Sequence, residues 1–246
     1  VIRRPANGTF AGLFTLFLAD VFMKKHFLPT LLILYSAQSL ASGMVPETTM
    51  LLVDESKGEA SINITNTDST PALLYTRVTE LPGSKSTTRL VATQPVVRLE
   101  AGHVQRVRFM LQTSGPLQQQ EMKRVSFEGI PAKTKDGNRL AVTIRQDLPV
   151  IIQPTSLPED LQPWKHLQWQ KKGSDIDIVN PGKYVVRMSP RFISMPSGKE
   201  GHLPATYILP GTHITVKLPQ TTDSKIKFYP ASRYGYTGES YTTALQ

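Results

Sequence analysis

The sequence predicts an all-β protein with two β-sandwich domains. Helix signals are scarce after residue 45, and the chain of 246 residues contains 19 prolines and 16 glycines. From Met44 onwards, short runs with strand composition are separated by turn residues. Such runs, spaced by turns, are typical of a β-sandwich. A chain of this length holds one large or two ordinary domains.

The first domain is predicted over residues 42–154 and the second over residues 161–246. Between them, the Pro-rich segment 155–160 reads as a linker. The strand candidates of the first domain are 49–53, 60–65, 72–80, 90–92, 96–99, 104–111, 123–127 and 140–154. Those of the second, smaller domain are 167–171, 175–179, 184–189, 205–209, 213–218 and 225–229.

The long strand candidate Leu140–Pro154 has an apolar residue at every second position, with only Gln146 breaking the row. Alternating residues of a strand lie on one face. Pro149 lacks a backbone donor, which favours an edge strand. Because a long apolar edge strand is an aggregation hazard, a protein that keeps one can use it to pair with another chain. The alternative is that this face packs into its own sandwich, above all from Leu148 to Ile152.

The N-terminal region predicts a secretory signal peptide over residues 23–41. A basic start, Met23-Lys24-Lys25, precedes a short apolar run, and small residues then allow cleavage after Ala41. Residues 1–22 are interpreted as an upstream or mis-started segment, with a membrane anchor as the alternative.

Composition and motifs favour neither nucleic-acid binding nor catalysis. The formal net charge is +9, but the basic residues are scattered. There is no phosphate-binding glycine motif, no Gly-x-Ser-x-Gly and no cysteine. The histidines lack metal-ligand spacing, and the neighbouring carboxylates Asp175 and Asp177 are interpreted as solvated. We therefore expect no enzyme activity, no cofactor, no metal and no small-molecule substrate.

The aromatic residues leave a second function class open. Trp164 and Trp169 follow the linker, and Tyr229, Tyr234, Tyr236 and Tyr241 cluster near the C-terminus. Packing is the favoured interpretation. The alternative is a carbohydrate-stacking surface, which would make the chain a secreted β-sandwich adhesin or carbohydrate-binding protein.

Several stretches of the chain form a recognisable set of motifs. In the first domain they are Ser61-Ile-Asn-Ile-Thr-Asn66, Thr93-Gln-Pro-Val-Val-Arg-Leu-Glu-Ala-Gly102, Gln105-Arg-Val-Arg-Phe109, Gly129-Ile-Pro131 and the strand Leu140–Pro154. In the second domain they are Val179-Asn-Pro-x-x-Tyr184 and Arg233-Tyr-Gly235. Together these stretches resemble the periplasmic pilus chaperones of the chaperone–usher pathway, the PapD-like family, in which the first motif corresponds to the second strand.

The resemblance implies two immunoglobulin-like domains arranged as a boomerang, working in the periplasm. Such chaperones bind pilus or fimbrial subunits that lack their last strand and deliver them to an outer-membrane usher. On this basis Leu140, Val142 and Ile144 are expected to insert into the subunit.

The sequence also departs from the family. Met50 and Pro149 stand where most members have the Arg and Lys that hold the subunit's C-terminal carboxylate. Gly129, Gln153 and Arg233 stand where the family's interdomain ionic triad would have two acidic residues and an arginine. The triad therefore looks absent from this chain. The segment around Arg124 is similar to an archaic or alternative branch, which makes Arg124 the expected anchor and Lys123 a lesser candidate. A degenerate paralogue that binds no subunit is the remaining alternative.

Overall fold

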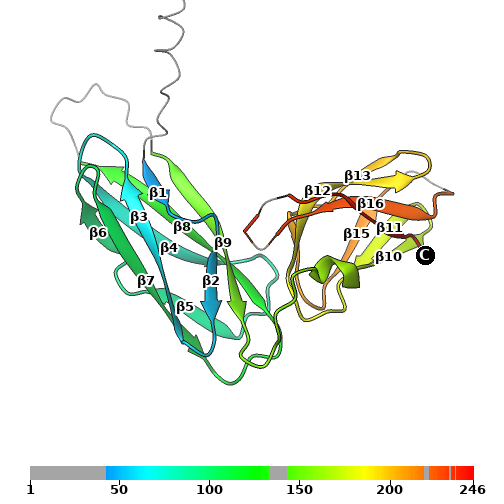
Figure 1. The fold of residues 1–246 in the computed structure, drawn as a ribbon, viewed down its shortest axis with the longest axis horizontal. Coiled ribbons are helices and arrows are strands. Elements are labelled where there is room, and N and C mark those ends of the chain that lie inside the picture. Colours follow the sequence, from blue (N-terminus) through cyan, green and yellow to red (C-terminus); the bar gives the residue numbers. More distant parts are fainter. Residues whose placement is uncertain (1–42, 133–142, 219–221, 233, 236) are drawn as a thin grey trace, which may run out of the picture. The chain divides into compact units, whose positions relative to one another are not determined.

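The computed structural model describes residues 43–132, 143–218, 222–232, 234–235 and 237–246. Residues 42–246 form one compact unit, and its strands make two β-sandwiches (Figure 1). The regular elements of these residues are strands, apart from the 3₁₀ helix η1 (Pro163–His166). The all-β prediction is therefore confirmed, while the predicted signal segment and the residues before it lie outside the described part.

The first sandwich packs a four-stranded sheet, in the order β1-β3-β7-β5, against a five-stranded sheet, in the order β2-β9-β8-β4-β6. Side chains along each strand point alternately to the two faces of its sheet. Residues such as Ile62 and Ile64 of β3, or Val125 and Phe127 of β8, are therefore buried between the sheets. The bounds are β1 (Met44–Pro46), β2 (Leu51–Asp54), β3 (Glu59–Asn66), β4 (Ala72–Glu80), β5 (Thr88–Ala92), β6 (Val96–Leu99), β7 (Val104–Thr113), β8 (Glu121–Pro131) and β9 (Arg145–Gln153).

The second sandwich packs the sheet β10-β11-β15 against the sheet β13-β12-β16-β17, with β14 also paired to β12. Trp169 lies at its centre, buried against Phe192 and Phe228 at ring distances of 5.1 and 5.4 Å. The bounds are β10 (Gln168–Lys172), β11 (Asp175–Val179), β12 (Val186–Met195), β13 (Glu200–His202), β14 (Tyr207–Ile208), β15 (His213–Lys217), β16 (Lys225–Pro230) and β17 (Tyr241–Ala244).

A third apolar cluster, which we call the seam, joins residues of both sandwiches. It contains Val185, just before β12, together with four buried residues of the first sandwich: Met50, Leu81, Met122 and Ile151. Because these side chains share one core, the start of β12 is packed against the region where β2 and β9 meet.

The sequence analysis located most of the strands but missed β1, β13 and β17 and misplaced some ends. The long strand begins at Arg145, whereas Leu140 was expected to start it; residues 133–142 are not described. In the second sandwich, the strand was predicted to end at Ser189, but β12 continues through Pro190 to Met195. The β12–β16 register shifts between Met188 and Phe192, and such an irregularity accommodates a residue without a backbone donor.

The first core predicts a large difference between two isoleucines. Ile152→Ala empties a fully buried site and should lower the free energy of unfolding by about 2–5 kcal/mol. Ile130→Ala, at a side chain 40% exposed, should change it by less than about 1 kcal/mol. Urea unfolding followed by circular dichroism measures both, and equal losses would contradict the assignment of the core.

Candidate functional site

The strand β9 has two neighbours along one half and one along the other. It pairs with β8 from Arg145 to Ile152, in an antiparallel register. On the opposite side, β2 runs parallel to β9 and pairs only with Val150–Gln153 (Figure 1). Within the part of the chain that the structure describes, Arg145–Pro149 therefore has no second strand beside it. The backbone groups on that side form an open edge, as Pro149 had indicated.

The burial of side chains also differs between the two ends of β9. Leu148, Val150 and Ile152 are buried in the first core, so this half of the apolar row packs into its own sandwich. Ile144, one residue before β9, is 43% exposed. Ile144 is one of the three residues predicted to enter a subunit, and it is an accessible apolar side chain beside the open edge. Leu140 and Val142 lie outside the described residues.

The open edge ends at Met50. This residue precedes β2 and is buried to 97%, since only 3% of its surface is exposed. Thr48 donates to the Met50 carbonyl at 2.8 Å, and Thr49 donates to the Tyr234 carbonyl at 2.5 Å. These bonds fix the turn that leads into β2. A strand added along Arg145–Pro149 would meet this turn and could not continue, because β2 occupies the next positions.

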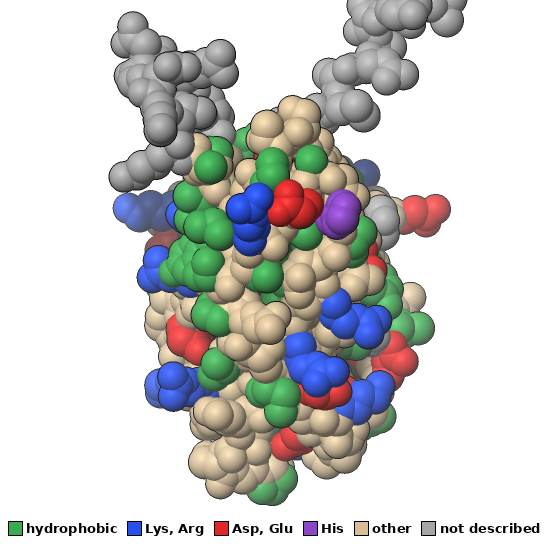
Figure 2. Space-filling model, turned by 90° about the vertical axis from the view of Figure 1, so that its left-hand side faces the viewer, with side chains coloured by type: hydrophobic (Ala, Val, Ile, Leu, Met, Phe, Trp, Pro, Cys, Tyr) green, Lys and Arg blue, Asp and Glu red, His purple; other side chains and the backbone are tan. Residues whose placement is uncertain are grey.

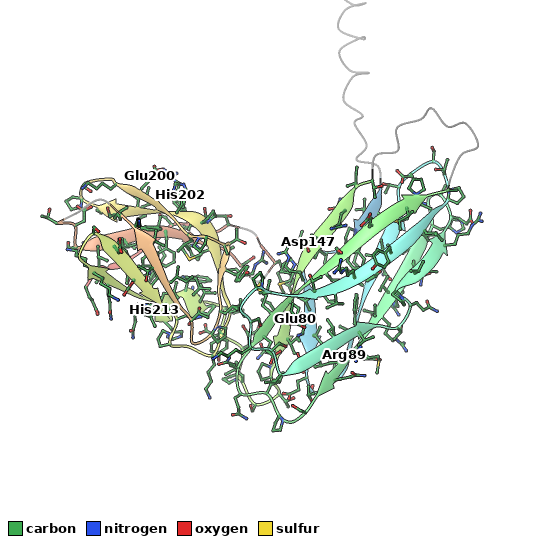
Figure 3. The ribbon with its side chains drawn as sticks, turned by 180° about the vertical axis from the view of Figure 1, so that it is seen from behind. Glu80, Arg89, Asp147, Glu200, His202 and His213 are labelled. Carbon is green, nitrogen blue, oxygen red and sulfur yellow. The ribbon has the colours of Figure 1, made fainter. Side chains whose placement is uncertain are left out.

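Arg124 of β8 lies directly opposite Pro149. Its Nε and Nη2 donate to Asp147, to the carboxylate Oδ1 at 3.1 Å and the carbonyl at 2.9 Å; Asp147 is labelled in Figure 3. The side chain is 27% exposed. Among the described residues, Nη1 makes no hydrogen bond. The predicted anchor, Arg124, is therefore a cation on the strand next to β9, opposite Pro149.

Lys123 occupies a different environment from its neighbour. Its side chain is fully buried, and the ammonium donates to Glu80 at 2.5 Å, to the Ser86 hydroxyl at 2.6 Å and to the Thr88 carbonyl at 2.9 Å (Glu80 is labelled in Figure 3). The ammonium is not presented to the open edge, as an anchor would require. Successive residues of a strand face opposite sides, so only one of this pair could point outward.

The cluster around Lys123 also holds Glu121. Burial alone would raise the pKa of Glu121, but hydrogen bonds from Ser86, Thr88 and Thr87 outweigh it and lower the pKa below its ordinary value. These hydrogen bonds connect the loop before β5 to the start of β8. The ammonium of Lys123 and the carboxylate of Glu121 therefore both have partners within the first sandwich.

Arg187 of β12 also lies at the end of the open edge, although the sequence analysis did not single it out. Its Nη1 lies 3.8 Å from the Met50 sulfur, so a guanidinium from the second sandwich contacts the residue that ends the open edge. Burial, followed by the positive charge of Arg124, lowers the pKa of Arg187. Nothing in its predicted strand 184–189 distinguished this arginine, because the contact joins residues 137 positions apart.

A pocket of about 700 Å³ lies beside Arg187. Its lining includes Met50, Leu52, Trp164 and Tyr234. Trp169 and Tyr241, by contrast, pack in the second core, which confirms packing as the interpretation of those two rings. Because Trp169 is buried in the second core, it cannot form part of a glycan-stacking surface.

Gln120, just before β8, connects the sandwiches near this pocket. Gln120 donates its amide to the Gln153 side chain at 2.7 Å and accepts from the Val185 amide at 2.8 Å. Its backbone donates to the Lys183 carbonyl at 2.8 Å. Gln153, expected at the triad position, thus hydrogen-bonds to the glutamine that makes this uncharged link. Gly129 lies against Met44, and Arg233 is outside the described residues.

Other kinds of site find no support in the described ranges. No group of three metal-ligating side chains occurs there. His202 and His213, labelled in Figure 3, lie on different strands, and His213 pairs with Asp177 at 3.1 Å. On the face drawn in Figure 2, basic and acidic side chains are mixed with apolar ones and form no basic tract. No helix in these ranges is long and apolar enough to cross a membrane.

Comparisons with known proteins agree with this architecture. Residues 43–158 match the family described as pili and flagellar-assembly chaperone, PapD N-terminal domain. A chain of the Salmonella enterica SafA pilin–SafB chaperone complex has the same fold, with a TM-score of 0.67 at 17% identity over 84% of this chain and 98% of that one. The YadV chaperone gives 0.66 at 20% identity over 82% and 99%. The two sandwiches thus have the fold of PapD-like pilus chaperones.

The sequence comparison shows the family. The chain is 56% identical over 224 residues to YhcA of Escherichia coli K12, which is described as an uncharacterized fimbrial chaperone; the match covers 91% of this chain and all of YhcA. The chain belongs to the fimbrial chaperones, a family that is not a class of enzymes.

The Glu121 network predicts an acid-sensitive contribution to stability. Because folding lowers the pKa of Glu121, its contribution is complete above the ordinary value of 4.5 and is lost as the pH falls through the folded-state pKa. Glu121→Gln should therefore destabilise most near neutral pH, with a difference from wild type that shrinks as the pH falls below 4.5.

Urea unfolding at several pH values measures this difference. Glu100→Gln is a matched control, since Glu100 is exposed and pairs only with Arg98 among the described ion pairs. A constant difference between wild type and the Glu121 variant at all pH values would contradict the role of the network.

Proposed function

We propose that this chain is a periplasmic chaperone that binds a pilus or fimbrial subunit by donating residues 140–152 to the subunit's incomplete fold. The observation that carries the proposal is the open edge of β9 over Arg145–Pro149, with the exposed Ile144 beside it. No catalytic step and no cofactor are needed, because the chaperone acts by completing a sheet.

Backbone pairing and apolar burial supply the binding free energy. An incomplete sandwich exposes unpaired backbone groups and an apolar groove, and the edge of β9 offers the missing partners. Leu140, Val142 and Ile144 would enter the groove, and burying three such side chains contributes roughly 5 kcal/mol or more. Leu148, Val150 and Ile152 keep the donor strand attached to the chaperone's own core.

Arg124 supports a specific anchor at the end of the donated edge. A guanidinium can hold a carboxylate with two parallel hydrogen bonds, and Nη1 of Arg124 adds a donor beyond those bound to Asp147. The subunit's C-terminal carboxylate would bind there. Delivery of the complex to an outer-membrane usher, and export through the segment 23–41, complete the proposal.

The donor role predicts that Ile144→Asp abolishes subunit binding. A carboxylate at this position would have to be buried unpaired in the client's groove, which costs several kcal/mol, whereas the free chaperone exposes the side chain. Co-purification of the subunit from periplasm with a tagged chaperone measures the complex.

Val104→Asp is the control, because Val104 on β7 is 58% exposed and lies in the other sheet. Val142→Asp should behave like Ile144→Asp. Subunit recovery unaffected by either donor substitution would refute strand donation. A wild-type chain that recovers no subunit would instead identify a degenerate paralogue.

The anchor role predicts that Arg124→Ala reduces subunit recovery about tenfold, the effect of losing one good charge-assisted hydrogen bond. Arg98→Ala, at a 69% exposed side chain of β6, serves as the control. Quantifying subunit per chaperone after co-purification distinguishes the two. Equal recovery from both variants would exclude Arg124 as the anchor.

A further inference from the structure

We propose that Lys123 is a positioning residue for the junction between the two sandwiches. Its ammonium fastens the end of β4 to the start of β8, and this fastening holds Leu81 and Met122 in the seam. Among the described residues, Lys123 is the one lysine whose side chain is fully buried. The role belongs to the free chain, so it goes beyond strand donation and does not depend on a client.

The ammonium of Lys123 acts where the seam begins. Lys123 of β8 lies directly opposite Glu80, the last residue of β4, and donates to its carboxylate at 2.5 Å (Glu80 is labelled in Figure 3). Leu81 follows Glu80, and Met122 precedes Lys123; both are buried in the seam. One charge-assisted hydrogen bond therefore joins the two backbone segments that carry these seam side chains.

The same ammonium also fixes the segment that leads from Leu81 into β5. It donates to the Ser86 hydroxyl at 2.6 Å and to the Thr88 carbonyl at 2.9 Å. With Glu80, these partners use the three donors of an ammonium group. Both ends of the segment are thus held against β8, and Leu81 at its beginning has little freedom to leave the seam.

A buried ammonium contributes more to position than to stability. Taking this charge out of water costs several kcal/mol, which its hydrogen bonds offset, so an apolar side chain of similar size often gives equal or greater stability. An apolar side chain would fill the site without fixing where Glu80 and the following segment lie. Because salt screens buried charges only weakly, the fastening also persists over a wide range of ionic strength.

Two amides report on the junction, because their hydrogen bonds cross from one sandwich to the other. The Val185 amide donates to the Gln120 side-chain oxygen at 2.8 Å, and the Gln120 amide donates to the Lys183 carbonyl at 2.8 Å. The side chain of Val185 also packs in the seam. A shift of the seam residues of the first sandwich would therefore break these two bonds more often, and both amides would exchange their hydrogens faster.

Hydrogen exchange of the full chain, followed for single amides by NMR, tests the role of Lys123. Lys123→Met should accelerate exchange at the Gln120 and Val185 amides about tenfold, the effect of losing one charge-assisted hydrogen bond. The Met188 amide, which is hydrogen-bonded within the second sandwich, should exchange as in wild type. Lys57→Met is the matched control, because Lys57 is an exposed lysine of the first sandwich, and it should leave all three amides unchanged.

Glu80→Gln tests the same bond from its other end, at a side chain that is 51% exposed. The amide oxygen still accepts a hydrogen bond, so exchange at the two cross-sandwich amides should rise only about threefold. Both substitutions remove one interaction, and the double variant should therefore exchange no faster than Lys123→Met alone. Leu81→Ala removes a seam side chain directly and should accelerate the same two amides about tenfold or more.

The outcomes separate positioning of the junction from general stabilisation. Faster exchange at the Gln120 and Val185 amides, with Met188 unchanged, supports the proposal. Wild-type exchange at these two amides in both Lys123→Met and Glu80→Gln overturns it, whatever Leu81→Ala does. Equal acceleration at Met188 also overturns it, because Lys123 would then stabilise the whole chain. If Lys123→Met does not fold, Glu80→Gln decides alone. No client is present, so failure of strand donation cannot be mistaken for any of these results.

Discussion

The pairing of β9 with its neighbours changes along the strand, and the rest of the proposed site depends on this change. From Val150 to Ile152 it is paired with a strand on each side, and Val150 and Ile152 fill the first core. Over Arg145–Pro149 it is paired only with β8 among the described strands. The buried part of the strand, from Val150 onwards, holds Arg145–Pro149 in an extended conformation. The open edge therefore loses little conformational entropy when another strand pairs with it. The position of β2 sets where this edge ends.

Charge is distributed around that end in a way that a residue-by-residue comparison with the family would miss. The side chains at the two aligned positions, Met50 and Pro149, are uncharged and buried. Arginines from neighbouring elements come beside them: Arg124 opposite Pro149, and Arg187 against Met50. The positive charge near this end of the open edge therefore comes from β8 and β12, although the two aligned positions are uncharged.

The sequence predicted what depends on local patterning and failed where tertiary contacts decide. Alternation located β3, β4, β7 and β9, and the buried Trp169 was expected. Short strands such as β13 carry too few residues for a periodic signal, and β12 passes Pro190 only because its register shifts there. Arg124 was preferred to Lys123 in sequence, but only the structure shows that β8 buries Lys123 fully and leaves Arg124 partly exposed. Arg187 gave no signal, because its neighbour Met50 is distant in the chain.

The link between the sandwiches holds the start of β12 against the region where β2 and β9 meet. It consists of the seam and of the hydrogen bonds from Gln120 to Val185 and Lys183, whose amides carry no charge and do not titrate. Salt screens exposed ion pairs but has little effect on such neutral bonds. We therefore expect this link to change little over a wide range of pH and ionic strength. Any electrostatic response of subunit binding would then arise at exposed charged groups such as Arg124, and the link between the sandwiches would contribute little to it.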